Sequence, residues 1–83
     1  MEDNTLNNLY KEISEIDKEI VNLLNARFDL VYEANQYKEK NDLPIKDLEH
    51  EWEVEENLEP LSNYTNMVKD IWEVIFKYGR TLK

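Results

Sequence analysis

The stretch LLNARFDL (residues 23–30) lies in the middle of the longest periodic segment of the chain. Apolar or aromatic residues recur along this segment every three or four positions, which is typical of one face of an α-helix. We call this series the apolar seam; it consists of Leu6, Leu9, Ile13, Ile16, Ile20, Leu23, Arg27, Leu30, Ala34 and Tyr37. The seam predicts one long helix from Thr5 to about Asn41. It also raises the question of why a guanidinium, that of Arg27, occupies a position on an apolar face.

The second half of the chain predicts two shorter helices. Asp47 is a good N-cap for the first of them, and Pro60 ends it. A third helical pattern begins near Asn63 or Thr65, and no segment shows the alternation of a β-strand. We therefore expect an all-α fold, a three-helix protomer with one long N-terminal helix, in which residues 1–83 form a single domain.

The length of the first helix predicts a second chain. About 36 residues at 1.5 Å per residue span roughly 54 Å, whereas a compact chain of this size has a radius of gyration near 12 Å. A domain this small also buries only a modest core. We therefore expect a homodimer in which the long helices pack along each other.

Composition excludes several classes of protein. The formal net charge is −9, with 19 acidic and 10 basic residues, which argues against nucleic acid as a partner. The chain contains no cysteine, and its start, MEDNTLNN, has neither the basic region nor the apolar core of a secretion signal. No apolar run approaches the length of a membrane span. We expect a soluble cytoplasmic protein whose anion site, if it has one, is a local cluster of cations.

A second cation, Lys38, lies on the same face of the predicted helix as Arg27. Eleven residues separate them, which places both on one face of the helix, about 20° apart around its axis and roughly 16 Å apart along it. Both side chains are pure hydrogen-bond donors, and an arginine can bind a carboxylate in a bidentate manner. The pair is suited to a small dianion. The alternative is that Arg27 lies along the seam and carries its charge to solvent, but neither Asp29 nor Glu33 has the spacing of an intrahelical partner.

Residues 6–51, from LNNLYKEISEIDKEIVNLLNARFDLV to PIKDLEHE, resemble the all-α (type II) chorismate mutases. The shared motifs are a leucine-rich start, an IDxxIvxLLnxR core, a yK near the end of the first helix, and lPIxDxxRE. A weaker resemblance continues through IWEVIFKYGRTLK at residues 71–83. The resemblance implies an intertwined dimer that rearranges chorismate to prephenate without a cofactor, in aromatic amino-acid biosynthesis.

The resemblance also implies roles for individual residues. Arg27 and Lys38 match the cations that hold a substrate carboxylate and, for the lysine, the breaking ether oxygen. Asp47 and Glu51 match the residues that meet the ring hydroxyl of the substrate. Lys83 stands where the family has a glutamine or glutamate near the ether oxygen, and an ammonium there would add catalytic charge.

Three further positions depart from the family pattern. Tyr10 stands where the family has an arginine that reaches into the partner subunit's site, His50 replaces the arginine of the RE pair, and Gly79 replaces a serine or threonine. A tyrosine offers one neutral hydrogen bond in place of the two charged hydrogen bonds of an arginine guanidinium, and a histidine is mostly neutral at pH 7. We therefore expect Tyr10 and His50 to contact substrate weakly and the enzyme to have reduced activity.

Two rival functions remain open. A degenerate domain of the same fold would bind ligand, or a partner such as an aromatic-pathway synthase, and regulate without turnover. A purely structural helical dimer would bind no ligand. His50 with Glu49 and Glu51 lacks the ligand set of a zinc site, so no metal is expected.

Overall fold

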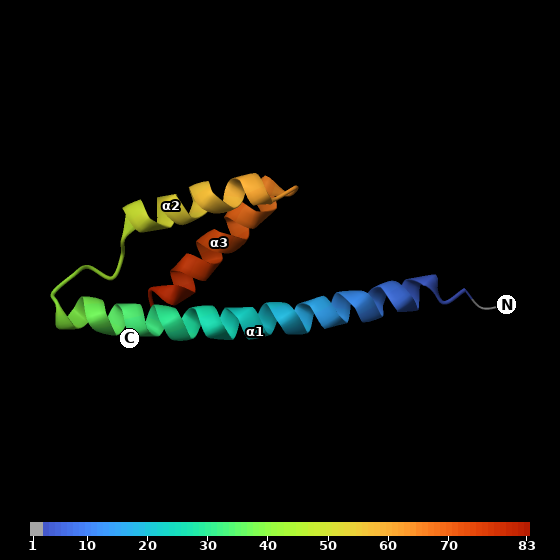
Figure 1. Cartoon of the computed structure of the whole chain (residues 1–83), viewed down its shortest axis with the longest axis horizontal. Helices are drawn as coiled ribbons and strands as arrows, with labels where there is room; N and C mark the ends of the chain where they lie inside the picture. Colours follow the sequence, from blue (N-terminus) through green and yellow to red (C-terminus); the bar gives the residue numbers. More distant parts are fainter. Residues whose placement is uncertain (1–2) are drawn as a thin grey trace.

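The computed structural model describes residues 3–83 and confirms an all-α protomer. It has three α-helices and one short 3-10 turn, and residues 3–83 contain no strand: α1 is Thr5–Lys40, α2 is Leu48–Leu58, η1 is Glu59–Leu61 and α3 is Thr65–Gly79. The helices α2 and α3 form a hairpin over the C-terminal half of α1, while the N-terminal half of α1 extends alone (Figure 1). The radius of gyration is 17.0 Å and the longest extent is 65 Å, so the protomer is far from compact.

A hydrogen-bonded turn ends α1 where the sequence predicts it. The backbone N–H of Asp42 donates to the Glu39 carbonyl, and that of Leu43 donates to the Lys38 carbonyl at 2.8 Å. These two bonds make a Schellman motif, which normally places glycine in the left-handed position. Here Asp42 takes that position with φ 56°, the one positive φ of a non-glycine residue in the part of the chain described. This turn starts the chain back toward α1.

The predicted cap and stop of α2 are also confirmed. The Asp47 side chain accepts a hydrogen bond from the backbone N–H of His50 at 3.1 Å, which satisfies one of the free donors at the helix start. Pro60 lies in η1, immediately after α2. The first residues of α2 therefore have a fixed orientation relative to the loop before them.

The core of the protomer is small and lies where α3 crosses α1. Ile75 and Phe76 of α3 are the only buried apolar side chains among residues 3–83. Asn35 of α1 is 2% exposed, and its Nδ2 donates to the carbonyls of Gly79 at 3.0 Å and Leu82 at 2.6 Å. A Cβ on Gly79 would lie 3.4 Å from the Val31 side chain, so the two helices approach closely there. A polar side chain thus fixes the end of α3 on α1.

The stripe of α1 that contacts α3 is displaced from the apolar seam. Half-buried side chains on α1 include Leu24, Phe28 and Val31, whereas Leu23 and Leu30 of the seam are 70% and 65% exposed. A strict seven-residue repeat drifts about 20° per heptad around a straight α-helix, so the seam winds away from α3 toward the end of α1. Within the protomer, the seam therefore does not serve as the α1–α3 interface over its whole length.

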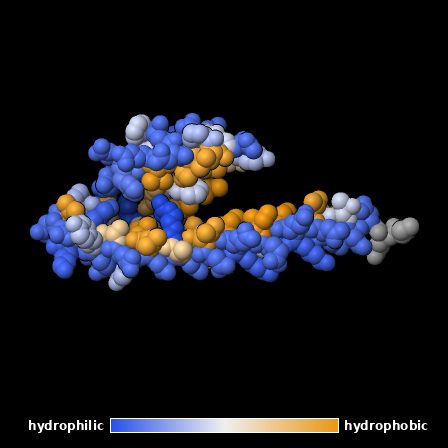
Figure 2. Space-filling model, viewed as in Figure 1, coloured by the Kyte–Doolittle hydropathy of each residue, from blue (hydrophilic) through white to orange (hydrophobic). Residues whose placement is uncertain are grey.

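The N-terminal half of the seam has no cover within the described protomer. Figure 2 shows it as an apolar stripe along α1 beyond the reach of the hairpin. Its large side chains are all about half exposed: Leu6, Leu9, Ile13, Ile16 and Ile20. This is the surface on which the predicted homodimer depends, and the dimer stays a prediction. Within residues 3–83, no helix combines the length and apolar composition required to cross a membrane.

Candidate functional site

A solvent-open cavity lies where the C-terminal half of α1, the start of α2 and the end of α3 meet. It contains about 480 Å³ of empty space, a volume that includes the part open to solvent. Its walls combine charged and apolar side chains: Arg27, Val31, Ala34, Asn35, Lys38, Ile45, Asp47, His50, Glu51, Phe76, Gly79 and Arg80. Val31 and Ala34, which lie between Arg27 and Lys38 on α1, form a small, apolar floor of the cavity.

Five of the seven residues that the sequence singles out line this one cavity. Arg27 and Lys38 come from α1, Asp47 from the loop before α2, and His50 and Glu51 from the first turn of α2. The loop that follows α1 is only seven residues long, and it brings α2 back beside the end of α1. The structure therefore places these side chains together, while their roles toward a ligand stay predictions.

Arg27 is half-buried against α3 and has no ion-pair partner among residues 3–83. Its Cζ lies 5.7 Å from the centroid of the Phe76 ring, a cation–π arrangement that supports the guanidinium from one side. Burial lowers the pKa of Arg27 from its ordinary value, but a guanidinium stays charged in proteins. Its positive charge is thus available to a ligand in the cavity.

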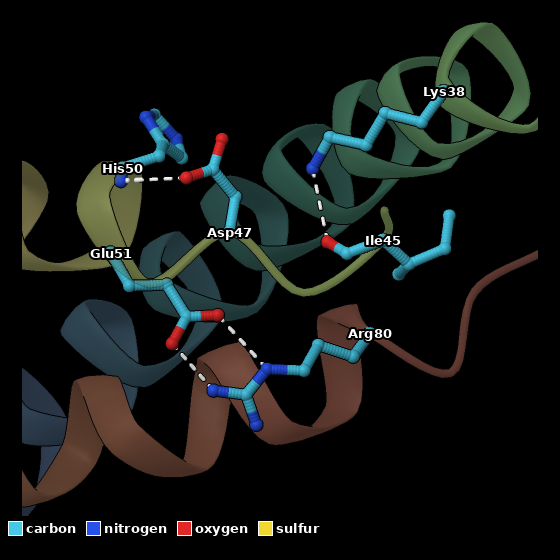
Figure 3. A network of polar contacts seen from close by, with 6 residues as sticks. All are labelled: Lys38, Ile45, Asp47, His50, Glu51 and Arg80. Atoms are coloured by element: carbon cyan, nitrogen blue, oxygen red, sulfur yellow. Dashed lines mark hydrogen bonds and ion pairs between the residues drawn. The ribbon is translucent and has the colours of Figure 1, made fainter. Parts of the chain in front are cut away.

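Lys38 is positioned by the loop that leads into α2. Its Nζ donates to the backbone carbonyl of Ile45 at 3.1 Å (Figure 3). An ammonium has three N–H donors, so this bond leaves two for a ligand. Lys38 is half-buried and makes no ion pair with another described residue.

Glu51 and Arg80 join α2 to the end of α3 across the cavity wall. Arg80 Nε donates to Glu51 Oε2 at 2.9 Å, and Arg80 Nη2 donates to Glu51 Oε1 (Figure 3). The hydrogen bonds with the carboxylate raise the pKa of Arg80 above its ordinary value. Glu51, expected to face a hydroxyl of the substrate, is therefore already held by a cation from the same chain.

Asp47 and His50 occupy the mouth of the cavity. Oδ1 of Asp47 accepts the cap hydrogen bond from the His50 N–H, which leaves its other oxygen without a hydrogen bond from the described residues. The His50 side chain is exposed. The two residues can contact a ligand only at the solvent side of the site.

Sequence reasoning missed Asn35 and Arg80. Asn35 had a detectable signal, because a polar residue four positions after Val31 and three before Lys38 lies on the stripe that carries the cations. Arg80 had none, since its partner Glu51 is 29 residues away and the pair depends on how the hairpin folds back.

Tyr10 and Lys83 lie outside the cavity of the protomer. Tyr10 is 59% exposed on the N-terminal half of α1, and its predicted role requires a second subunit. Lys83 is the exposed last residue and does not line the cavity. The predictions for both residues remain open.

The site as a whole offers three cations, two carboxylates and an apolar floor, a set suited to a compact anion that also carries a hydroxyl. Comparison with protein families matches residues 9–83, nearly the whole chain, to the family described as chorismate mutase type II. Searches among curated proteins and among solved structures gave no significant match.

Proposed function

Because this chain belongs to the chorismate mutase type II family, we propose that it is an isomerase that rearranges chorismate to prephenate. The observation that carries the proposal is the convergence of Arg27 and Lys38, three helical turns apart on α1, on one cavity that also holds Asp47 and Glu51. Two cations without ion-pair partners in the described chain match a substrate with two carboxylates.

The proposed reaction is intramolecular and pericyclic, so the protein has to hold a compact conformer and stabilise developing charge. As the C–O bond of the ether breaks, negative charge grows on its oxygen, and a preorganised donor at that point lowers the barrier. Arg27 binds a carboxylate with its two-pronged guanidinium. Lys38, fixed by its bond to Ile45, places its remaining N–H donors at the ether oxygen. Glu51 and Asp47 orient the ring hydroxyl.

We further propose that the active form is a homodimer. The uncovered N-terminal half of the seam supports this, because large apolar side chains stand half exposed there in a row and contiguous apolar surface of this kind usually marks an interface. In such a dimer Tyr10 reaches the partner's cavity. Tyr10 and His50 lack the permanent charge and the paired N–H donors of arginine, which supports an activity lower than that of members with arginines at both places.

The second candidate is a degenerate domain that binds ligand, or a synthase of the same pathway, without turnover. One observation favours it: both oxygens of Glu51 are engaged by Arg80. In this reading the cavity serves for regulation.

The test is the loss of chorismate absorbance with purified protein, for the natural chain and for the double variant Tyr10→Arg, His50→Arg. Measurable turnover that rises strongly in the double variant supports the mutase. Binding of chorismate with no turnover in either protein supports the regulatory domain. Neither binding nor turnover refutes both and leaves a structural dimer.

A further inference from the structure

Without Arg80, the formal charges of the residues around the cavity add up to about zero. At neutral pH, Arg27 and Lys38 contribute two positive charges, while Asp47 and Glu51 contribute two negative ones. His50 is left out of this sum, as histidine is counted as neutral in the formal charge of the chain. The sum is close to zero, in a chain whose overall charge of −9 already repels anions. Arg80 is the cavity residue that makes the sum positive.

The geometry of the ion pair leaves Arg80 able to bind a second group. A guanidinium has five N–H donors in one plane, and the two bonds to Glu51 use Nε and one N–H of Nη2. Three N–H groups remain, two on Nη1 and one on Nη2, and Figure 3 shows Nη1 on the side of the guanidinium away from the Glu51 carboxylate. The two bonds also hold the side chain in one orientation, which lowers the entropy cost of binding to it.

We propose that Arg80 is a third anion-binding residue of the cavity, with Glu51 holding the guanidinium so that its remaining N–H groups meet a carboxylate of the ligand. Arg80 then supplies a permanent positive charge to the cavity from the C-terminal end of α3. Neither the sequence pattern nor the family match points to this position. The inference rests on the proposed function only for the choice of a dicarboxylate as ligand.

The first test measures the Kd of prephenate, a dicarboxylate, by titration calorimetry. Arg80→Gln is expected to raise Kd roughly ten- to a hundredfold, the range for a lost hydrogen bond to a charged group. Arg80→Lys keeps the positive charge but lacks the paired N–H donors of the guanidinium, so it is expected to recover part of the lost affinity. Lys77→Gln is the matched control, since Lys77 is an exposed cation of the same helix that does not line the cavity. An Arg80→Gln effect no larger than that of Lys77→Gln overturns the proposal.

The second test separates binding by Arg80 from mere support of Glu51. In a Glu51→Gln background no ion pair remains to be supported, yet Arg80→Gln is still expected to raise Kd about tenfold, the effect of one charged hydrogen bond. No change in that background means that Arg80 acts only through Glu51, and it overturns the proposal. Circular dichroism serves to check that each variant is folded. The double variant lacks both the Glu51 carboxylate and the Arg80 guanidinium, so neither group is left without its ion-pair partner.

The two proposals fail separately. Turnover of chorismate by the natural chain with no dependence of Kd on Arg80 removes the inference and keeps the mutase. Absence of turnover with Kd dependent on Arg80 keeps the inference and removes the mutase. Absence of any dicarboxylate binding removes both.

Discussion

Replacing Arg27 by leucine tests why a guanidinium lies in an apolar seam. If Arg27 serves the ligand, the change removes one preorganised donor, which typically costs about 2.7–4 kcal/mol of transition-state stabilisation, a roughly hundred- to thousandfold loss in rate. The same change removes the contact with Phe76, which is worth about 0.5–1 kcal/mol at a partly exposed position. The apolar contacts of leucine offset that loss, and no ion pair of the described chain is broken.

The expected result is therefore a large fall in kcat/KM with little change in stability. The loss of chorismate absorbance gives kcat/KM, and thermal melting gives stability, for which 1 kcal/mol corresponds to about 4–8 °C in a domain of this size. Lys11→Leu is the control, because Lys11 is an exposed cation of α1 about 160° around the helix from Arg27. Unchanged kcat/KM, or a clear rise in melting temperature together with no stabilisation by chorismate, refutes the reasoning and favours a structural role.

Three other outcomes follow from features of the chain. His50→Arg alone is expected to raise kcat/KM because it places a permanent positive charge at the cavity mouth; an unchanged kcat/KM excludes this position from the site. Asn35→Leu leaves the carbonyls of Gly79 and Leu82 without their hydrogen-bond donor. The free energy of unfolding, measured by urea titration, is expected to fall by about 1–3 kcal/mol; a much smaller fall would show that water replaces the amide as donor. Asp42→Gly relieves a left-handed backbone position and is expected to raise the free energy of unfolding by up to about 1 kcal/mol, whereas a loss would show that the Asp42 side chain stabilises the turn.

Local sequence signals were enough to predict the helices. The spacing of the seam, the cap at Asp47 and the stop at Pro60 are short-range features, and the predicted end of the first helix near Asn41 agrees with its observed end at Lys40. The juxtaposition of Arg27 and Lys38 was predictable for the same reason, because one rigid helix fixes both.

Tertiary geometry was not predictable in the same way. The pairing of Glu51 with Arg80 requires the hairpin to return over α1 at one particular angle, and no spacing rule connects residues 29 positions apart. The periodic pattern also did not predict which face of α1 contacts α3, because a seven-residue repeat drifts around a straight α-helix. Tyr10 depends on a second chain, which the sequence of one protomer does not position.

One continuous helix carries both the apolar stripe of the N-terminal half and the two cations of the cavity. Inserting or deleting a single residue between Ile20 and Arg27 would turn one set by about 100° relative to the other. The number of residues in this stretch is therefore constrained as tightly as their identity. Among natural variants and in engineering, insertions and deletions in the middle of α1 are therefore expected to abolish function.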